Sequence, residues 1–149
     1  MATKTLTKPG TGLAPVTRPY HTYQLENTID FLVTANQLAQ NDIAELIAIP
    51  ANCWVAGIRW EILVVEGAAR NFGIGDGSGT SSYIATTSAN AVSEGAMILA
   101  LTEGVPNTIT GYSAGKYYAV ADTIDVLAVT AGGLVACKLR VTADIRDYN

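Results

Sequence analysis

The chain has 149 residues, of which 49% are hydrophobic and only 15% are charged, and its formal net charge at pH 7 is −4. No apolar run approaches the ~18 residues that a membrane-spanning helix needs, and the nine Lys and Arg residues are too scattered to follow a phosphate backbone. Membrane and nucleic-acid partners are therefore not expected. The length predicts one domain with its own core.

The low charged fraction, against about 25% in an average soluble domain, favours a protein that buries further surface against other subunits. A monomer whose surface is rich in small residues is the alternative. Cys53 and Cys137 have no disulfide-framework spacing, so we predict buried free thiols, although one disulfide stays open. The N-terminus has no signal-peptide core, and we expect the protein to remain in the cytoplasm in which it is made until it assembles.

Residues 1–24 contain Pro9, Pro15 and Pro19, which break helices and central strands and favour an extended backbone. We therefore divide the chain into an extended N-terminal arm, residues 1–24, and a β domain, residues 25–149. A disordered tail is the usual alternative at a terminus. The arm, however, has more apolar anchors than a solvated tail requires: Leu6, Leu13, Val16, Tyr20 and Tyr23. A neighbouring subunit is the surface on which we expect it to lie.

The first strands of the domain are predicted at 28–33 and 43–49, separated by a loop or a single helical turn. A Pro-Ala-Asn turn at 50–52 then leads into the next strand, either as a connected pair or as a corner between two sheets.

The longest alternating stretch is 54–65, where Trp54, Ala56, Ile58 and Trp60 share one face with Ile62 and Val64. The charged side chains of this stretch mark the other face as the wetter one. Two tryptophans on one face need a second layer to cover them. This stretch is therefore predicted to be a central strand of a two-layered β domain.

Shorter strands are expected at 70–74, 80–85 and 96–101, with a glycine-rich loop at 75–79. In that loop we expect glycine to supply positive-φ positions, and Asp or Ser to bond back to the backbone. The last two strands are predicted at 123–128 and 134–146, joined by a hairpin turn at 131–133. The final strand should turn these side chains inward: Cys137, Leu139, Val141, Ala143 and Ile145. The pattern predicts an all-β fold, a single β-sandwich of jelly-roll or other Greek-key topology.

A search for catalytic chemistry finds no site. His21 is the only histidine and lies in the arm, a poor place to hold a triad, and the chain offers no zinc ligand set. The glycine-rich loop lacks the Lys-Ser/Thr of a phosphate loop and the ligand spacing of a calcium loop. The Gly115-Lys116 pair is followed by Tyr117, where a phosphate loop has the Ser or Thr whose hydroxyl binds magnesium. We predict no catalytic residue, cofactor or metal, and hence no enzyme.

Tyrosines near predicted loops leave a sugar-binding interpretation open: Tyr83, Tyr112, Tyr117 and Tyr118. Packing at a sheet end or subunit contact, with the hydroxyl at the wet edge, is the simpler interpretation.

Four segments stand out as a set: Gly-Thr-Gly-Leu-Ala-Pro-Val-Thr-Arg-Pro-Tyr at 10–20, Ile-Pro-Ala-Asn at 49–52, Gly-Ile-Gly-Asp-Gly at 73–77, and Thr-Gly-Tyr-Ser-Ala-Gly-Lys-Tyr-Tyr at 110–118 leading into Ala-Asp-Thr-Ile-Asp at 121–125. Together they resemble small virion structural proteins of tailed bacteriophages. The resemblance covers most of the chain and depends on structural turns.

Among such proteins, many of this size resemble capsid decoration, or cement, proteins. The resemblance implies a homo-oligomer, with a trimer favoured over a dimer, bound to the major capsid protein on the outer surface of the capsid. Expected interface residues are Leu6, Leu13, Val16, Arg18, Tyr20, Tyr112, Tyr117 and Tyr118. Alternatives are a carbohydrate- or receptor-binding virion module and a head–tail or tail component.

Overall fold

The computed structural model describes residues 1, 3–8, 21–96 and 115–147. Within these ranges the regular structure is β, apart from a 3-10 turn at Thr34–Asn36 in the segment where a loop or one helical turn was predicted. None of the described residues forms a helix with the length and apolar character to cross a membrane.

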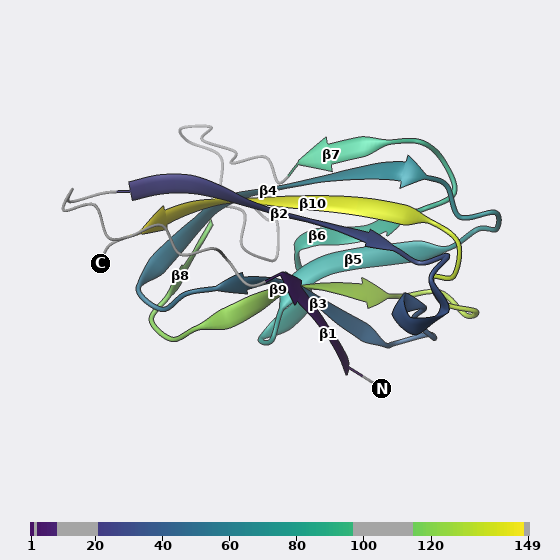
Figure 1. The fold of residues 1–149 in the computed structure, drawn as a ribbon, viewed down its shortest axis with the longest axis horizontal. Helices are drawn as coiled ribbons and strands as arrows, with labels where there is room; N and C mark the ends of the chain where they lie inside the picture. The colour runs from purple at the N-terminus through teal and green to yellow at the C-terminus, as the bar shows by residue number, and fades with distance from the viewer. Residues whose placement is uncertain (2, 9–20, 97–114, 148–149) are drawn as a thin grey trace, which may run out of the picture.

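Two sheets face each other (Figure 1). The first has the spatial order β1 (Thr3–Lys8), β3 (Ile43–Ile49), β9 (Asp122–Ala128), β5 (Asn71–Asp76) and β6 (Gly79–Ser88). The second has the order β2 (His21–Asp30), β10 (Lys138–Asp147), β4 (Cys53–Val64) and β7 (Glu94–Ala96), and β8 (Lys116–Tyr118) also pairs with β4. The prediction of a β-sandwich is confirmed.

The strand pairs are nested along the chain. β2 pairs with β10, β3 with β9, β4 with β7 and β5 with β6, all antiparallel, so the two halves of the chain lie side by side in reverse order. β1 is the exception, because it runs parallel to β3 at the sheet edge. β2 begins at His21, inside the segment predicted as the arm.

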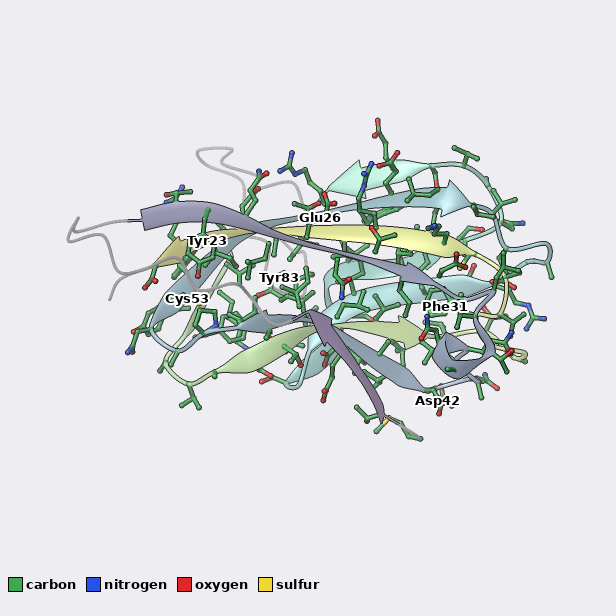
Figure 2. The ribbon with its side chains drawn as sticks, in the orientation of Figure 1. Tyr23, Glu26, Phe31, Asp42, Cys53 and Tyr83 are labelled. Atoms are coloured by element: carbon green, nitrogen blue, oxygen red, sulfur yellow. The ribbon has the colours of Figure 1, made fainter. Side chains whose placement is uncertain are left out.

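The side chains of the two inner faces fill the space between the sheets (Figure 2). The inward face of β10 is as predicted: Leu139, Val141, Ala143 and Ile145 are fully buried, and Cys137 just before the strand is 1% exposed. From the facing sheet, the Phe72 ring meets the Trp60 ring edge-on, with centroids 5.4 Å apart and planes at 84°. Both cysteines are buried free thiols.

β4 departs from the strict alternation that was predicted. Gly57 pairs with Asp144 while Val55 pairs with Ile145, so Ala56 is an extra residue, a β-bulge. Because a one-residue shift moves side chains to the other face, Trp54 lies half-buried on the outer face and does not share the core with Trp60. A second register shift between Lys138 and Leu139 of β10 lies opposite the end of β4, where the predicted inward residue Val64 is exposed.

Two of the connections that cross between the sheets are at turns predicted from the sequence. β3 and β4 lie in different sheets, so the turn at 50–52 is a corner, and Asn52 adopts the left-handed conformation there, with φ of 58°. The predicted hairpin at 131–133 is wrong, since β9 and β10 also lie in opposite sheets. Gly132 and Gly133 have φ of 87° and 68°, and the Gly133 N–H donates to the Thr130 carbonyl at 2.9 Å. The same turn chemistry serves a hairpin or a crossing, and packing decides between them.

The glycine-rich segment is mostly strand. β5 continues through Asp76, β6 begins at Gly79, and only two residues form the turn. None of its glycines has the positive φ that was predicted. Gly75 is needed for space, because the register of β5 and β6 is irregular here and a Cβ on it would lie 1.9 Å from the carbonyl oxygen of Gly79.

We predict that Gly75→Ala lowers the free energy of unfolding by about 1–3 kcal/mol, as over-packing does in tight sites. Gly67→Ala is the matched control, since a Cβ there meets nothing within 4 Å, and its effect should stay within about 1 kcal/mol. Urea unfolding followed by tryptophan fluorescence measures both. Equal stability of the two variants would show that Gly75 is not in close contact with β6.

Candidate functional site

The structure describes three of the eight residues predicted at an interface. Leu6 belongs to β1, which pairs with β3 of the same chain. Tyr117 is 45% exposed, whereas Tyr118 is only 3% exposed, so Tyr118 can serve an interface only by holding its neighbour in place. The other five lie outside the described residues: Leu13, Val16, Arg18, Tyr20 and Tyr112.

Tyr117 has an aromatic neighbour that sequence reasoning missed. Its register partner on β4 is Trp54, and its hydroxyl donates to the Asn52 side-chain oxygen at 3.2 Å. Gly115, with φ of 84°, leaves room for the indole, because a Cβ there would lie 2.5 Å from Trp54 Nε1. The sequence pattern assigned Trp54 to the core, and only the bulge at Ala56 brings it to this surface.

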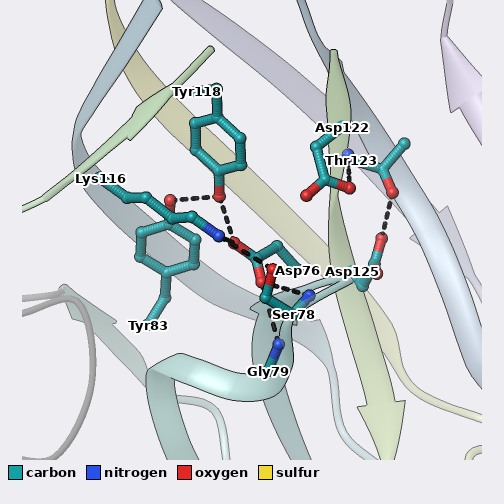
Figure 3. A network of polar contacts seen from close by, with 9 residues as sticks. All are labelled: Asp76, Ser78, Gly79, Tyr83, Lys116, Tyr118, Asp122, Thr123 and Asp125. Carbon is teal, nitrogen blue, oxygen red and sulfur yellow. Dashed lines mark hydrogen bonds and ion pairs between the residues drawn. The ribbon is translucent and has the colours of Figure 1, made fainter. Parts of the chain in front are cut away.

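Asp76 is the centre of a buried polar network beside this surface (Figure 3). Its carboxylate is fully buried and accepts hydrogen bonds from Lys116 Nζ at 2.6 Å, the Tyr118 hydroxyl at 2.5 Å, and the backbone N–H groups of Ser78 at 2.9 Å and Gly79 at 3.0 Å. The Tyr83 and Tyr118 hydroxyls are 2.6 Å apart. Since Tyr118 gives its proton to Asp76, Tyr83 is the donor in that pair.

These donors determine the charge state of Asp76. Burial alone would raise the pKa of the carboxyl, but the hydrogen bonds from Lys116, Tyr118 and Ser78 lower the pKa below its ordinary value. Burial and the bond to Asp76 raise the pKa of Tyr118, so its hydroxyl keeps its proton. The network therefore holds an ionised carboxylate paired with a partly exposed lysine.

Two glycine motifs that resembled phosphate loops meet in this network, one carrying Asp76 and the other Lys116, 40 residues apart. The Asp76 carboxylate neutralises the Lys116 ammonium group, so the pair has no net positive charge to attract a phosphate. In the part of the chain that is described, no group of three or more His, Cys, Asp and Glu residues could hold a metal ion. The arrangement fastens β8, and Tyr117 with it, to the β5–β6 turn.

Asp125 is a second buried carboxyl, 4% exposed, and has a different environment. It lies on β9 with Glu45 of β3 and Gly75 of β5 as register partners, and it accepts a hydrogen bond from Thr123 Oγ1 at 2.7 Å. Burial raises the pKa of Asp125 to about 7; the Thr123 bond opposes this, and the nearby charges, Glu45 first, add to it. Asp125 thus binds a proton more readily in the folded chain than in the unfolded one.

Glu66, 2% exposed, fastens the crossing from β9 to β10. One of its oxygens accepts the backbone N–H groups of Val135, Ala136 and Cys137 at 3.0–3.1 Å. Burial would raise the pKa of Glu66, but these three bonds lower it overall. This carboxylate has a structural role, because its partners are the backbone of the crossing.

We predict that Asp76→Asn lowers the free energy of unfolding by about 3 kcal/mol, because it leaves Lys116 facing a buried site without its counter-charge. The double variant D76N/K116M should recover part of that loss. Asp144→Asn is the control: its ion pair with Arg59, 3.2 Å long, is on the surface, and its loss should cost at most about 1 kcal/mol. Chemical unfolding at pH 7 compares them. Equal losses for D76N and D144N would contradict a stabilising network.

The stability contribution of Asp125 should depend on pH with a definite sign. A folded-state pKa of about 7 lies above the unfolded value of 3.8, so this stability is complete below about pH 4 and is lost as the pH rises toward 7. Asn cannot ionise, so Asp125→Asn should match the parent protein near pH 4. At pH 8 it should be more stable, by on the order of 2–4 kcal/mol.

Thermal unfolding across this pH range tests the prediction, with Glu94→Gln, an exposed carboxylate on β7, as the control. If the difference in stability between D125N and the parent protein does not change with pH, the prediction is wrong.

No protein-family model matches the sequence, and no curated protein matches it. Three solved structures share the fold. A chain in the capsid of Ralstonia phage GP4 is 15% identical over 97% of this chain and 99% of its own, with a TM-score of 0.64. A chain in the Cyanophage Pam1 capsid asymmetric unit is 14% identical over 94% and 99%, with a TM-score of 0.60. A chain in the acidic stable capsid of Helicobacter pylori bacteriophage KHP30 is 12% identical over 86% and 89%, with a TM-score of 0.56.

At these identities the likeness shows the fold. It is a likeness of nearly entire chains, so it covers the sandwich as a whole. In the GP4 comparison the two chains have nearly the same length, because each is covered almost completely.

Proposed function

We propose that this chain is a non-enzymatic structural protein of a tailed-bacteriophage virion. The observation that carries the proposal is the match of 86–97% of this chain to chains of three phage capsids. The nested strand pairs support a jelly-roll topology, in which one long antiparallel ribbon is rolled into two facing sheets, an architecture found in viral capsids.

Within that class we propose a decoration, or cement, protein that binds the assembled capsid on its outer surface, with the major capsid protein as its partner. The chain self-associates, with a trimer favoured over a dimer. The match to a GP4 capsid chain over 99% of that chain supports a shell component built on this sandwich. A low charged fraction suits tight subunit contacts.

The outer face of β2, β10 and β4 is polar, which supports an arrangement in which this side of the protein faces solvent on the shell. Cross-strand ion pairs cover it: Arg59 with Asp144 at 3.2 Å, Lys138 with Asp30 at 3.5 Å, and Arg140 with Glu61. An antiparallel sheet with one polar face is typical of a sheet whose outer side meets water. The shell contacts are then made by the sheet edges and the arm, through Leu6, Leu13, Val16, Arg18 and Tyr20.

The mechanism is stabilisation by mass action. A protein that binds the expanded, assembled shell and not its dissociated subunits shifts the equilibrium toward the intact shell. Many copies bind one shell at once, so avidity allows each contact to be weak.

A second candidate is a carbohydrate- or receptor-binding virion module. The observation that favours it is the neighbouring pair of Trp54 and Tyr117 on the outer face, because aromatic faces pack against sugars. A head–tail or tail component is the remaining alternative within the virion class.

We predict that deletion of residues 1–20 abolishes binding to purified expanded capsids and the gain in shell heat resistance that the full-length protein gives. Co-sedimentation and capsid melting measure the two effects. Because the deletion also removes β1, the full-length variant R18A/Y20A is tested beside it and should weaken binding at least ~10-fold, a loss of about 1.4 kcal/mol. Failure of the full-length protein to bind capsids would contradict the decoration role.

The matched variant W54A/Y117A separates the two candidate functions. A decoration protein whose arm makes the main shell contacts keeps most of its capsid binding in this variant, because Tyr117 is only a secondary contact. A sugar-binding module loses glycan binding in this variant and is indifferent to deletion of the arm.

A further inference from the structure

Exposed apolar side chains gather at one end of the sandwich. Nine large hydrophobic side chains of the described residues are exposed, and six of them belong to segments that meet at this end. It is the end at which β2 and β4 finish and β7 and β10 begin (Figure 1). We call this surface the apolar end, and its residues are Leu32, Val33, Leu63, Val64, Val65 and Val92.

Strand register joins the β2 side of the apolar end to the β4 side. Lys138 of β10 has Asp30 of β2 as its register partner on one side and Val64 of β4 on the other. Leu32 and Val33 follow Asp30 after a single buried residue. The apolar side chains of the two strands are therefore separated only by the ion pair between Asp30 and Lys138.

Two backbone hydrogen bonds place Val92 against the end of β4. The Ile62 N–H donates to the Ser93 carbonyl, and the Glu66 N–H donates to the Ala89 carbonyl, both at 2.8 Å. The connection that contains Val92 thus runs beside the whole segment between Ile62 and Glu66. The six side chains form one patch.

The fold leaves this patch unburied. Leu32 and Val33 lie in a turn, where Asn, Asp, Gly and Ser are the usual residues, and they are 61% and 51% exposed. Val92 is 77% exposed. Apolar surface left in water forgoes about 25 cal/mol for each Å², and a contiguous exposed patch of this kind is typical of an interaction surface.

The charges within the patch favour a second copy of this chain as its occupant. Asp30 and Lys138 form an ion pair of 3.5 Å, with side chains 34% and 39% exposed. One acid and one base balance each other, so two such ends that face one another can present each charge to its opposite. The chain as a whole carries a net charge of −4, which makes copies repel one another. A contact with balanced charge avoids that repulsion.

We propose that copies of this chain associate through the apolar end, which meets the same end of a second copy at the symmetry axis of the oligomer. This deepens the proposed function, because it rests on the self-association proposed there and names the surface responsible. The six apolar side chains become buried between copies, and Asp30 and Lys138 gain partners across the contact. The rest of the outer face of β2, β10 and β4 stays in solvent.

Paired charge substitutions at Val64 test the contact. Val64 is 41% exposed, so the full-length variants V64K and V64E should both fold, which circular dichroism checks. Each variant alone should self-associate at least ~10-fold more weakly than the parent protein, as loss of one well-packed interface residue produces. When the two variants are mixed, opposite charges meet across the contact and association should recover. Light scattering and sedimentation equilibrium measure both effects.

V120K and V120E are the matched controls. Val120 is 76% exposed and lies between β8 and β9, at the opposite end of the sandwich (Figure 1), so both variants should self-associate as the parent protein does. A parent protein that is monomeric at every soluble concentration overturns the inference. Association of V64K and V64E as tight as that of the parent overturns it too, and so does a mixture that recovers none of the lost association.

Capsid binding by V64K, measured by co-sedimentation, separates this inference from the proposed function. Lost capsid binding with unchanged self-association would mean that a capsid protein covers the apolar end, and would overturn the inference. A parent protein that self-associates through this end but does not bind capsids would refute the decoration role and leave the inference standing.

Discussion

The burial of two apolar sheet faces against each other is the constraint on which the rest of the structure depends. β10 lies between β2 and β4, and its inward side chains are fully buried against the facing sheet. Because the strands pair in nested order, β2 and β10, which lie near opposite ends of the chain, pair with each other along their whole length. Such non-local pairing makes folding slow, and it places both ends of the ribbon in the same sheet.

Two of the three buried carboxyl groups hold parts of the chain that this pairing leaves loose. Asp76 fastens β8, and Glu66 fastens the crossing between β9 and β10; both keep their charge because donors surround them. Asp125 has one hydrogen-bond donor and acidic neighbours, and favours its protonated form. Acid therefore weakens the first two sites while a rising pH weakens the third, so stability should be greatest between those limits.

Alternation in the sequence was sufficient to predict β3, the inward face of β10 and the sandwich itself, since each depends on which side chains a strand buries. It could not predict the bulge at Ala56, because an extra residue leaves no mark in a stretch whose residues on both sides are apolar. The bulge moved Trp54 from the expected core to the surface beside Tyr117. The crossing at 131–133 was missed for a similar reason, as glycine turns suit hairpins and sheet crossings alike.

The polar network was beyond sequence reasoning for another reason. Asp76 and Lys116 lie 40 residues apart in motifs that each looked like an isolated turn, and only the fold brings them together. The arm is the opposite case: its composition predicted an extended segment, and the structure adds a parallel pairing with β3 that composition could not indicate.

Electron cryo-microscopy of the intact virus particle tests the central claim most directly. The account predicts this sandwich in multiple copies on the outside of the capsid shell, with the polar face of β2, β10 and β4 toward solvent. A map that places the sandwich only in the tail or connector, or that shows no copy of it on the shell, would contradict the account.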